Sequence, residues 1–146
     1  MAFGAVCGTV AAFAASTDSG VSFLGVPSPV ASAAAASELA DLGKQLFFDP
    51  ALSADGTISC STCHQPDKAF SDGKALAEGV GGQRGSRNAP SLLNAGYLTS
   101  QFWDGRRATL EDQVLDPLFN PKEHGLQGGD DLLAKIRSNE GYVARF

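Results

Sequence analysis

The sequence of 146 residues is short of the features on which several large classes of protein depend. It has only 11 basic against 16 acidic residues, and the resulting net charge of −5 argues against nucleic acid as a partner. No apolar stretch is long enough to cross a membrane, and no alternating pattern typical of strands is present. Cysteine (three), histidine (two) and methionine (one) are scarce, whereas 17 glycines predict long, shaped loops. The length suffices for one domain with a modest core.

Three of the scarce residues stand together in Cys60-Ser61-Thr62-Cys63-His64. This C-x-x-C-H pattern is the attachment sequence of a c-type haem. On one helical turn the two thiols can reach two vinyl groups on one edge of a porphyrin, and the following imidazole can bind the iron from below. The sequence therefore predicts one covalently bound haem c, with Cys60 and Cys63 as its attachment points and His64 as the proximal iron ligand.

Three other interpretations of the motif are weaker. A zinc site would need further ligands, yet only Cys7 and His124 remain, and adjacent Cys63 and His64 are poorly placed to share one tetrahedral ion. A thioredoxin-like redox pair should follow a strand in a βαβ pattern, which is missing. A disulfide between Cys60 and Cys63 would leave His64 without a role.

The first 15 residues are apolar and rich in small side chains, and Ala12-Phe13-Ala14 is similar to a signal-peptidase site. The usual basic segment is missing, so we expect a signal peptide that is incomplete or begins upstream. Its removal would take Cys7 with it, and lipid attachment at Cys7 is the alternative. Since C-x-x-C-H haem attachment occurs outside the bacterial cytoplasm, the predicted location is the periplasm. Residues 16–36 are predicted to be a linker.

Helical spacing of apolar residues predicts an all-α domain from Ser37 onward. We expect a first helix with Ser37 as its N-cap and Pro50 as its stop, followed by the attachment helix. Three further helices are predicted at residues 89–97, after a Thr109 cap with Leu110, Val114 and Leu118 on one face, and at residues 130–137. Residues 65–88 are glycine-rich and aperiodic, which favours a long loop that wraps a flat ligand.

Six blocks of the sequence occur in an order known from one family. They are LGKQLFFDP (42–50), the haem motif (60–64), GGQRG (81–85), RNAP (87–90), QFWDGR (101–106) and NPKE (120–123). From about Ser37 to Phe146 the chain thereby resembles the bacterial di-haem cytochrome c peroxidases and the related MauG proteins. The resemblance implies a cytochrome c-like haem domain at residues 37–146, equivalent to the N-terminal, peroxidatic domain. The family carries a second C-x-x-C-H domain, which this sequence lacks, so we expect a fragment, a truncated product or half of a split system.

The resemblance also implies roles for single residues. Glu123 matches a distal glutamate that moves a proton between the two oxygens of peroxide, and Gln113 matches a distal glutamine that supports the peroxide pocket by hydrogen bonding. Trp103 matches a tryptophan that passes electrons from the second haem, and Asn88 matches a ligand of a calcium ion whose other ligands come from the missing half. Without the family, Glu123 is a surface acid and Trp103 is the single large core aromatic.

Two positions depart from the family pattern. Val80 stands where many of these peroxidases have a histidine that binds the resting iron, so we expect a five-coordinate or water-bound haem, as in the MauG-like branch. His124 follows Glu123, where an apolar residue is usual. It is either a distal iron ligand or, as we expect, a surface histidine.

The leading hypothesis is a haem peroxidase domain that reduces hydrogen peroxide with electrons from a small cytochrome or cupredoxin. Calcium is expected only together with the missing domain, and a homodimer is a further expectation. Three rivals remain open: a MauG-like oxidase of a protein side chain, a monohaem electron carrier, and an inactive truncated fragment. The only methionine is Met1, which argues against the Met–His ligation of a carrier.

Overall fold

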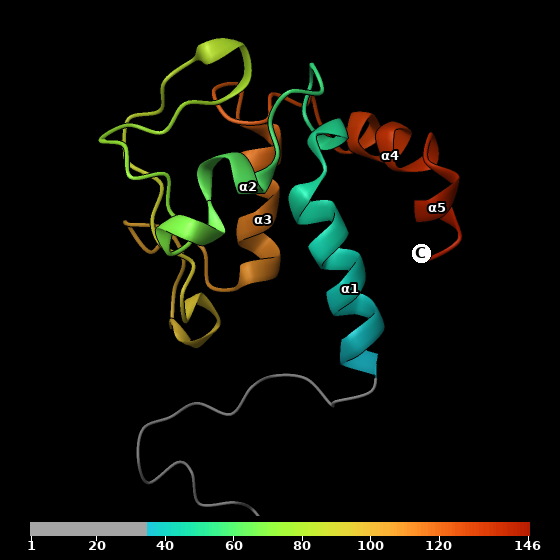
Figure 1. Ribbon diagram of the computed structural model, residues 1–146, viewed down its shortest axis with the longest axis horizontal. Helices are drawn as coiled ribbons and strands as arrows, with labels where there is room; N and C mark the ends of the chain where they lie inside the picture. The colour runs from blue at the N-terminus through green and yellow to red at the C-terminus, as the bar shows by residue number, and fades with distance from the viewer. Residues whose placement is uncertain (1–34) are drawn as a thin grey trace, which may run out of the picture.

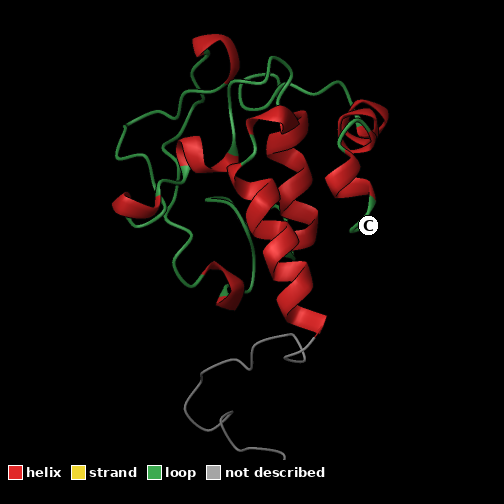
Figure 2. Ribbon diagram, turned by 45° about the vertical axis from the view of Figure 1, so that its right-hand side comes forward, coloured by secondary structure: helices red, strands yellow, loops and turns green. Residues whose placement is uncertain are grey.

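The computed structural model describes residues 35–146, which form helices joined by long loops (Figures 1 and 2). The α-helices are α1 (Ala35–Phe48), α2 (Cys60–Cys63), α3 (Leu110–Phe119), α4 (Gly129–Arg137) and α5 (Glu140–Val143). The 3-10 turns are η2 (Pro50–Leu52), η3 (Pro66–Lys68), η4 (Val80–Gly82) and η5 (Ala95–Tyr97). Within the described residues, strand-like pairing is limited to the isolated bridges Gln65–Ser71, Glu78–Arg84 and Gln101–Arg107. The all-α prediction is confirmed.

The expectations for the signal peptide, for Cys7 and for nearly all of the linker lie outside the described residues. Among the helices of residues 35–146, none is long and apolar enough to cross a membrane.

The helices and the long loops occupy different sides of the molecule (Figure 1). Helices α1, α4 and α5 stand on one side, and the loops between α2 and α3 gather on the other. Helix α2 lies between them and contacts α1, while α4 contacts both α5 and η2. The attachment cysteines therefore lie where the helical side of the fold meets the loops.

The first helix begins earlier than its sequence predicts. Ser37 lies inside α1, which includes Ala35 and Ala36, so the predicted N-cap is wrong. Alanine is the best helix former, which explains why the helix extends over these two residues. Its end is as predicted, because Asp49 is extended and caps the next turn, where Pro50 takes the first position.

The helix predicted at residues 89–97 is wrong, since only the short turn η5 forms there. Ser91 uses its hydroxyl twice, donating to the Ala69 carbonyl at 2.6 Å and accepting from the Leu93 amide at 3.2 Å. Asn94 has a positive φ of 60°. A side chain that bonds to nearby backbone and a left-handed residue both compete with helix formation.

The third helix is capped as predicted, with the Thr109 hydroxyl accepting from the Asp112 amide at 3.1 Å. Its apolar face is buried only at the C-terminal end. Leu118 belongs to the core cluster, whereas Leu110 and Val114 are 40% and 44% exposed. The cluster consists of Leu52, Leu118 and Leu126, against which Leu46, Phe119, Leu132 and Ile136 pack.

Helix α5 is attached to the end of α1 by a hydrogen bond between distant residues. The hydroxyl of buried Tyr142 donates to Asp49 Oδ2 at 2.5 Å. Asp49 Oδ1 accepts from the Ala51 amide at 2.8 Å, so one carboxylate serves both contacts. Burial and the Asp49 hydrogen bond raise the pKa of Tyr142 to about 12, which keeps its hydroxyl protonated and able to donate.

We expect Tyr142→Phe to lower the free energy of unfolding by about 1.5–3 kcal/mol, the usual range for a hydrogen bond to a charged group. Urea unfolding followed by circular dichroism measures this change. Tyr97→Phe is the matched control, because Tyr97 is exposed, and it should change stability by less than about 0.5 kcal/mol. Equal unfolding midpoints for Tyr142→Phe and the unaltered chain would contradict the prediction.

Candidate functional site

The short helix α2 is fixed at its start by serine and threonine hydroxyls. The buried Ser53 hydroxyl donates to the Pro50 carbonyl at 2.9 Å and accepts from the Ile58 amide at 3.1 Å. The Ser59 amide donates to Thr62 Oγ1 at 3.0 Å, as in a capping box. Within this helix both cysteines are free and half-buried, so the structure shows no Cys60–Cys63 disulfide.

His64 ends this helix with its ring held in one orientation. Its Nδ1 lies 3.0 Å from the Phe70 carbonyl and 3.1 Å from the Pro90 carbonyl. A carbonyl only accepts, so Nδ1 carries the proton and Nε2 keeps its lone pair. A hydrogen bond from one ring nitrogen to a carbonyl is the usual arrangement of a histidine that binds a metal through its other nitrogen.

Two consecutive left-handed residues bring one of those carbonyls into place. Ala69 and Phe70 have φ values of 54° and 57°, in a region that non-glycine residues rarely adopt. The Phe70 amide donates to the Gln65 carbonyl at 2.8 Å, which closes the turn after the motif. Such strain is often found where a functional group must be positioned.

The residues present fit a covalently attached haem. Two free thiols on one helical turn and an imidazole with a free Nε2 are the donor set that this group needs. Many large apolar side chains of the described residues are exposed, among them Leu76, Leu93, Leu98 and Leu115. A domain this small gains stability from a large flat apolar group that covers such surface. Among the same residues, no three His, Cys, Asp or Glu side chains gather as a metal cluster.

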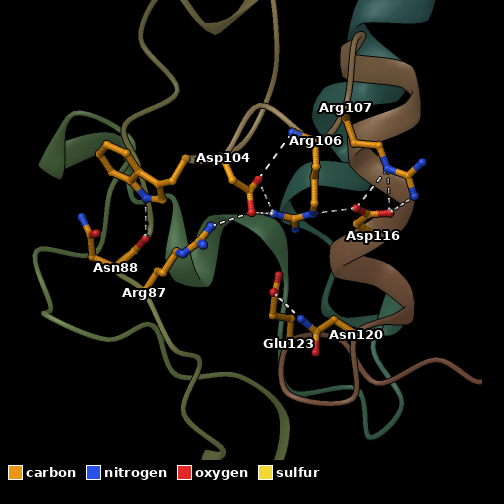
Figure 3. A network of polar contacts seen from close by, with 9 residues as sticks. Arg87, Asn88, Asp104, Arg106, Arg107, Asp116, Asn120 and Glu123 are labelled. Carbon is orange, nitrogen blue, oxygen red and sulfur yellow. Dashed lines mark hydrogen bonds and ion pairs between the residues drawn. The ribbon is translucent and has the colours of Figure 1, made fainter.

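Glu123 lies in a tight loop after α3 and is half-buried, not the surface acid of the alternative interpretation. Asn120 shapes this loop: its carbonyl accepts from the amides of Glu123 at 3.0 Å and Gly125 at 2.9 Å. Its side-chain Nδ2 also donates to Glu123 Oε1 at 2.6 Å (Figure 3). Burial raises the pKa of Glu123, while the Asn120 hydrogen bond and the charge of Arg106 act in the opposite direction.

The glycine-rich loop before Arg84 is hydrogen-bonded to the Glu123 loop. The Val80 amide donates to the Glu123 carbonyl at 2.9 Å, and Gln83 Nε2 donates to the Pro121 carbonyl at 3.1 Å. A Cβ at Gly79 would stand 2.2 Å from the Lys122 carbonyl oxygen and 2.6 Å from Glu123 Cα. Only glycine allows this approach of the two backbones. The sequence predicted that the backbone of this loop approaches a flat ligand. It did not predict the close approach of this backbone to that of Glu123.

Val80 is buried beside the same loop. Its Cγ1 would lie 3.0 Å from a Cβ on Gly125, which has a φ of +76°. A hydrocarbon side chain therefore fills the position at which many relatives were expected to carry an iron-binding histidine.

Trp103 is 61% exposed, so the interpretation as a core aromatic is wrong. Its indole Nε1 donates to the Asn88 carbonyl at 3.3 Å. The two sequence-predicted residues Trp103 and Asn88 are thus neighbours, joined through the backbone of Asn88.

A chain of alternating charges continues from this contact to α3, and sequence reasoning missed it. Asp104 accepts from Arg87 at 2.9 Å and from Arg106 at 3.0 Å, and Asp116 pairs with Arg106 at 3.4 Å and with Arg107 at 2.7 Å (Figure 3). The hydrogen bonds from Arg87 and then Arg106 hold the pKa of Asp104 at about 2. Arg106 also lies 3.4 Å from the centre of the Phe102 ring. The spacing of these residues in the sequence gives no sign that they meet.

Gln113 is half-buried on α3. The structure contains no hydrogen bond between Gln113 and Glu123, both of which it describes. The side-chain amide that donates to Glu123 is that of Asn120.

His124 is buried, with 5% of its surface exposed, so the expectation of a surface histidine is wrong. Its amide donates to the Pro117 carbonyl at 3.1 Å, and its carbonyl accepts from the Ala54 amide at 2.8 Å. The imidazole Nε2 lies 4.0 Å from Cys60 Sγ. The ring is therefore beside an attachment cysteine.

Comparison with known proteins gives a consistent result. The sequence model described as di-haem cytochrome c peroxidase matches residues 37–146. The chain is 43% identical over 105 residues to the cytochrome c peroxidase Ccp of Escherichia coli, covering 72% of this chain and 23% of that protein. It is 39% identical over 127 residues to the methylamine utilization protein MauG of Paracoccus denitrificans, covering 74% and 33%.

Solved structures agree with the sequence matches. The crystal structure of the diheme peroxidase BthA from Burkholderia thailandensis superposes with a TM-score of 0.68 at 36% identity, covering 74% of this chain and 31% of that one. The chain thus spans about a quarter to a third of the length of these relatives, in their N-terminal part.

Proposed function

Because the chain belongs to the di-haem cytochrome c peroxidase family, we propose that residues 37–146 form a c-type haem domain that reduces hydrogen peroxide to water. Electrons would come from a small redox protein, a cytochrome or a cupredoxin. One observation carries the proposal: His64 has its Nδ1 engaged and its Nε2 free, and the same domain holds the half-buried carboxylate of Glu123 in place through the Asn120 side chain.

In this proposal Cys60 and Cys63 hold the haem through thioethers and His64 holds its iron. When bound, the haem supplies the redox chemistry that breaks the oxygen–oxygen bond. The proposal includes a periplasmic location, because haem attachment through C-x-x-C-H occurs outside the bacterial cytoplasm, and the expected signal peptide supports it.

Glu123 would carry the proton that this reaction has to move. Peroxide must lose a proton from one oxygen and gain one on the other before water can leave, and a positioned carboxylate can do both. Because Asn120 donates to Oε1, Oε2 is the oxygen that remains free to take the proton. The Arg106 guanidinium, whose charge reaches Glu123, favours the ionised form that accepts it.

Trp103 would pass electrons toward the site, and its exposed ring suits contact with another redox group. Its hydrogen-bond partner is the Asn88 carbonyl, and because Asn88 is the proposed calcium ligand, the calcium ion would lie next to the electron path. Calcium would require ligands beyond those of this chain. Gln113 remains a proposed second amide of the peroxide pocket.

The test uses the haem-loaded full chain, purified from the periplasm of a strain competent in cytochrome c maturation. Hydrogen peroxide and a reduced small cytochrome c are added, and the oxidation of the cytochrome is followed optically. The proposal predicts oxidation of two cytochromes for each peroxide consumed. Oxidation no faster than with the haem-free chain would overturn it.

We expect Asn120→Ala to move the acid limb of peroxide turnover to higher pH. A hydrogen bond donated to a carboxylate stabilises its ionised form, so losing it raises the pKa of Glu123 beyond the rise that burial already causes. Fewer chains then carry the carboxylate at a given pH. The measurement is kcat/KM for peroxide against pH, with the exposed substitution Thr99→Ala as control. An unmoved limb would show that Asn120 does not act on Glu123.

Oxidation of a protein side chain, as in the MauG branch, is the second candidate. It is favoured by Val80, whose side chain has no lone pair for the iron and is buried beside the Glu123 loop. The two functions differ in what is oxidised. Peroxide consumption that continues without the reduced cytochrome, and that leaves an oxidised side chain on a partner protein, would favour the second candidate.

A further inference from the structure

The buried imidazole of His124 lies against the thiol of Cys60, the first of the two attachment cysteines. Its Nε2 is 4.0 Å from Cys60 Sγ, at the range of a weak hydrogen bond to sulfur. The residue is only 5% exposed, and its Nδ1 has no hydrogen-bond partner within the described residues. A buried polar group without a partner costs folding free energy, so it requires an explanation.

The backbone holds His124 in this place from two sides. Its amide is bonded to the Pro117 carbonyl of α3, and its carbonyl accepts from the Ala54 amide, in the turn that leads into α2. The same turn carries Ser53, which fixes the start of the attachment helix. The backbone of His124 is therefore held beside the segment that leads into the attachment helix.

The second cysteine has no imidazole beside it. Cys63 Sγ donates to the Glu78 carbonyl at 3.6 Å, and a carbonyl oxygen cannot take the thiol proton. Burial, with the nearby charges of Asp72 and Glu123, raises the pKa of Cys63 to about 11. Burial also raises the pKa of Cys60 and lowers that of His124, so Cys60 is a thiol next to a neutral imidazole.

We propose that His124 is a general base that activates Cys60 for its covalent attachment to haem. The thiol proton passes to Nε2 of His124, and the sulfur adds to the inner carbon of a haem vinyl group. The S–C bond forms as the carbon–carbon π bond breaks, and the terminal vinyl carbon receives a proton from the imidazolium. His124 is then neutral again, and the addition consumes no oxidant or reductant.

This inference goes beyond the proposed peroxidase function, since attachment is measured without peroxide. It predicts an asymmetry between two cysteines that are three residues apart. Loss of His124 should slow thioether formation at Cys60 and leave that at Cys63 nearly unchanged.

The experiment expresses the full chain with the cytochrome c maturation proteins for a short induction, so that attachment is sampled before it is complete. Free thiols are then alkylated, and peptide mass spectrometry gives the alkylated fraction of each cysteine separately. We compare the unaltered chain with His124→Leu and His124→Gln. Both variants should slow attachment at Cys60 by about tenfold or more. A positioned general base usually contributes about 10²- to 10⁴-fold, so tenfold is a conservative threshold. Attachment at Cys63 should change by less than about twofold.

Leu118→Val is the matched control, because it alters the core beside the same loop without touching a proton acceptor. Equal attachment at Cys60 in all four chains would overturn the proposal. Equal loss at Cys60 and Cys63 would also overturn it, since it would assign His124 a general role in folding. If Leu118→Val lost attachment at Cys60 as strongly as the His124 variants, the proposal would also be overturned, because a change in packing alone would explain the loss.

Discussion

Replacing Glu123 with glutamine is expected to lower the rate of peroxide consumption by about 10²- to 10⁴-fold, the usual contribution of a positioned acid–base group. Glutamine keeps the shape of the side chain and an oxygen that can accept the Asn120 hydrogen bond. It cannot take a proton from peroxide at any pH near neutrality. The loss should therefore appear in both kcat and kcat/KM, measured by peroxide-dependent oxidation of a reduced cytochrome.

Glu111→Gln is the control, because Glu111 is an exposed carboxylate on α3 outside the site. It should leave turnover within twofold of the unaltered chain, and both variants should contain the same amount of haem per polypeptide. If Glu123→Gln turned over peroxide like the control at equal haem content, Glu123 would not carry the proton.

Gly79→Ala is expected to lower the free energy of unfolding by about 3 kcal/mol or more, at the upper end of overpacking substitutions. The added methyl would stand 2.2 Å from the Lys122 carbonyl oxygen and 2.6 Å from the Glu123 carbonyl oxygen and Cα. All these atoms belong to backbone, which cannot rotate away as a flexible side chain would. The Glu123 loop must therefore move, and peroxide turnover should fall together with stability.

Chemical unfolding followed by circular dichroism measures the effect of Gly79→Ala. Gly43→Ala is the matched control, since Gly43 lies inside α1 with nothing within 4 Å of a Cβ. Alanine is the better helix former, and this change should raise stability by about 0.5–1 kcal/mol. Similar stability of the two variants would show that the approach of the Gly79 loop to the Glu123 loop is not tight in solution.

Several elements could be predicted because their signals are local. The Thr109 cap needs only a hydroxyl three residues before an amide, and α3 begins where that pattern places it. The helix predicted at residues 89–97 failed for the opposite reason. Ser91 bonds to Ala69, a residue far along the chain, and such contacts do not follow from helical spacing.

The residues of the candidate site likewise fall into those with a local sequence signal and those whose position depends on distant contacts. The roles proposed for Cys60, Cys63 and His64 are predicted from five consecutive residues, and that of Glu123 from a family pattern. The burial of His124, the exposure of Trp103 and the Asp104–Arg106–Asp116 chain depend on segments that meet only in the folded protein.

The sequence alone determined the cofactor chemistry and the helical class, because thiol spacing and helical periodicity are properties of neighbouring residues. Tertiary structure decided which amide holds Glu123, which loop is bonded to it and which cysteine has an imidazole beside it. Those contacts join Gly79 to Lys122 and Cys60 to His124. They arise when distant backbones close on one another, and no local pattern encodes the distance between them.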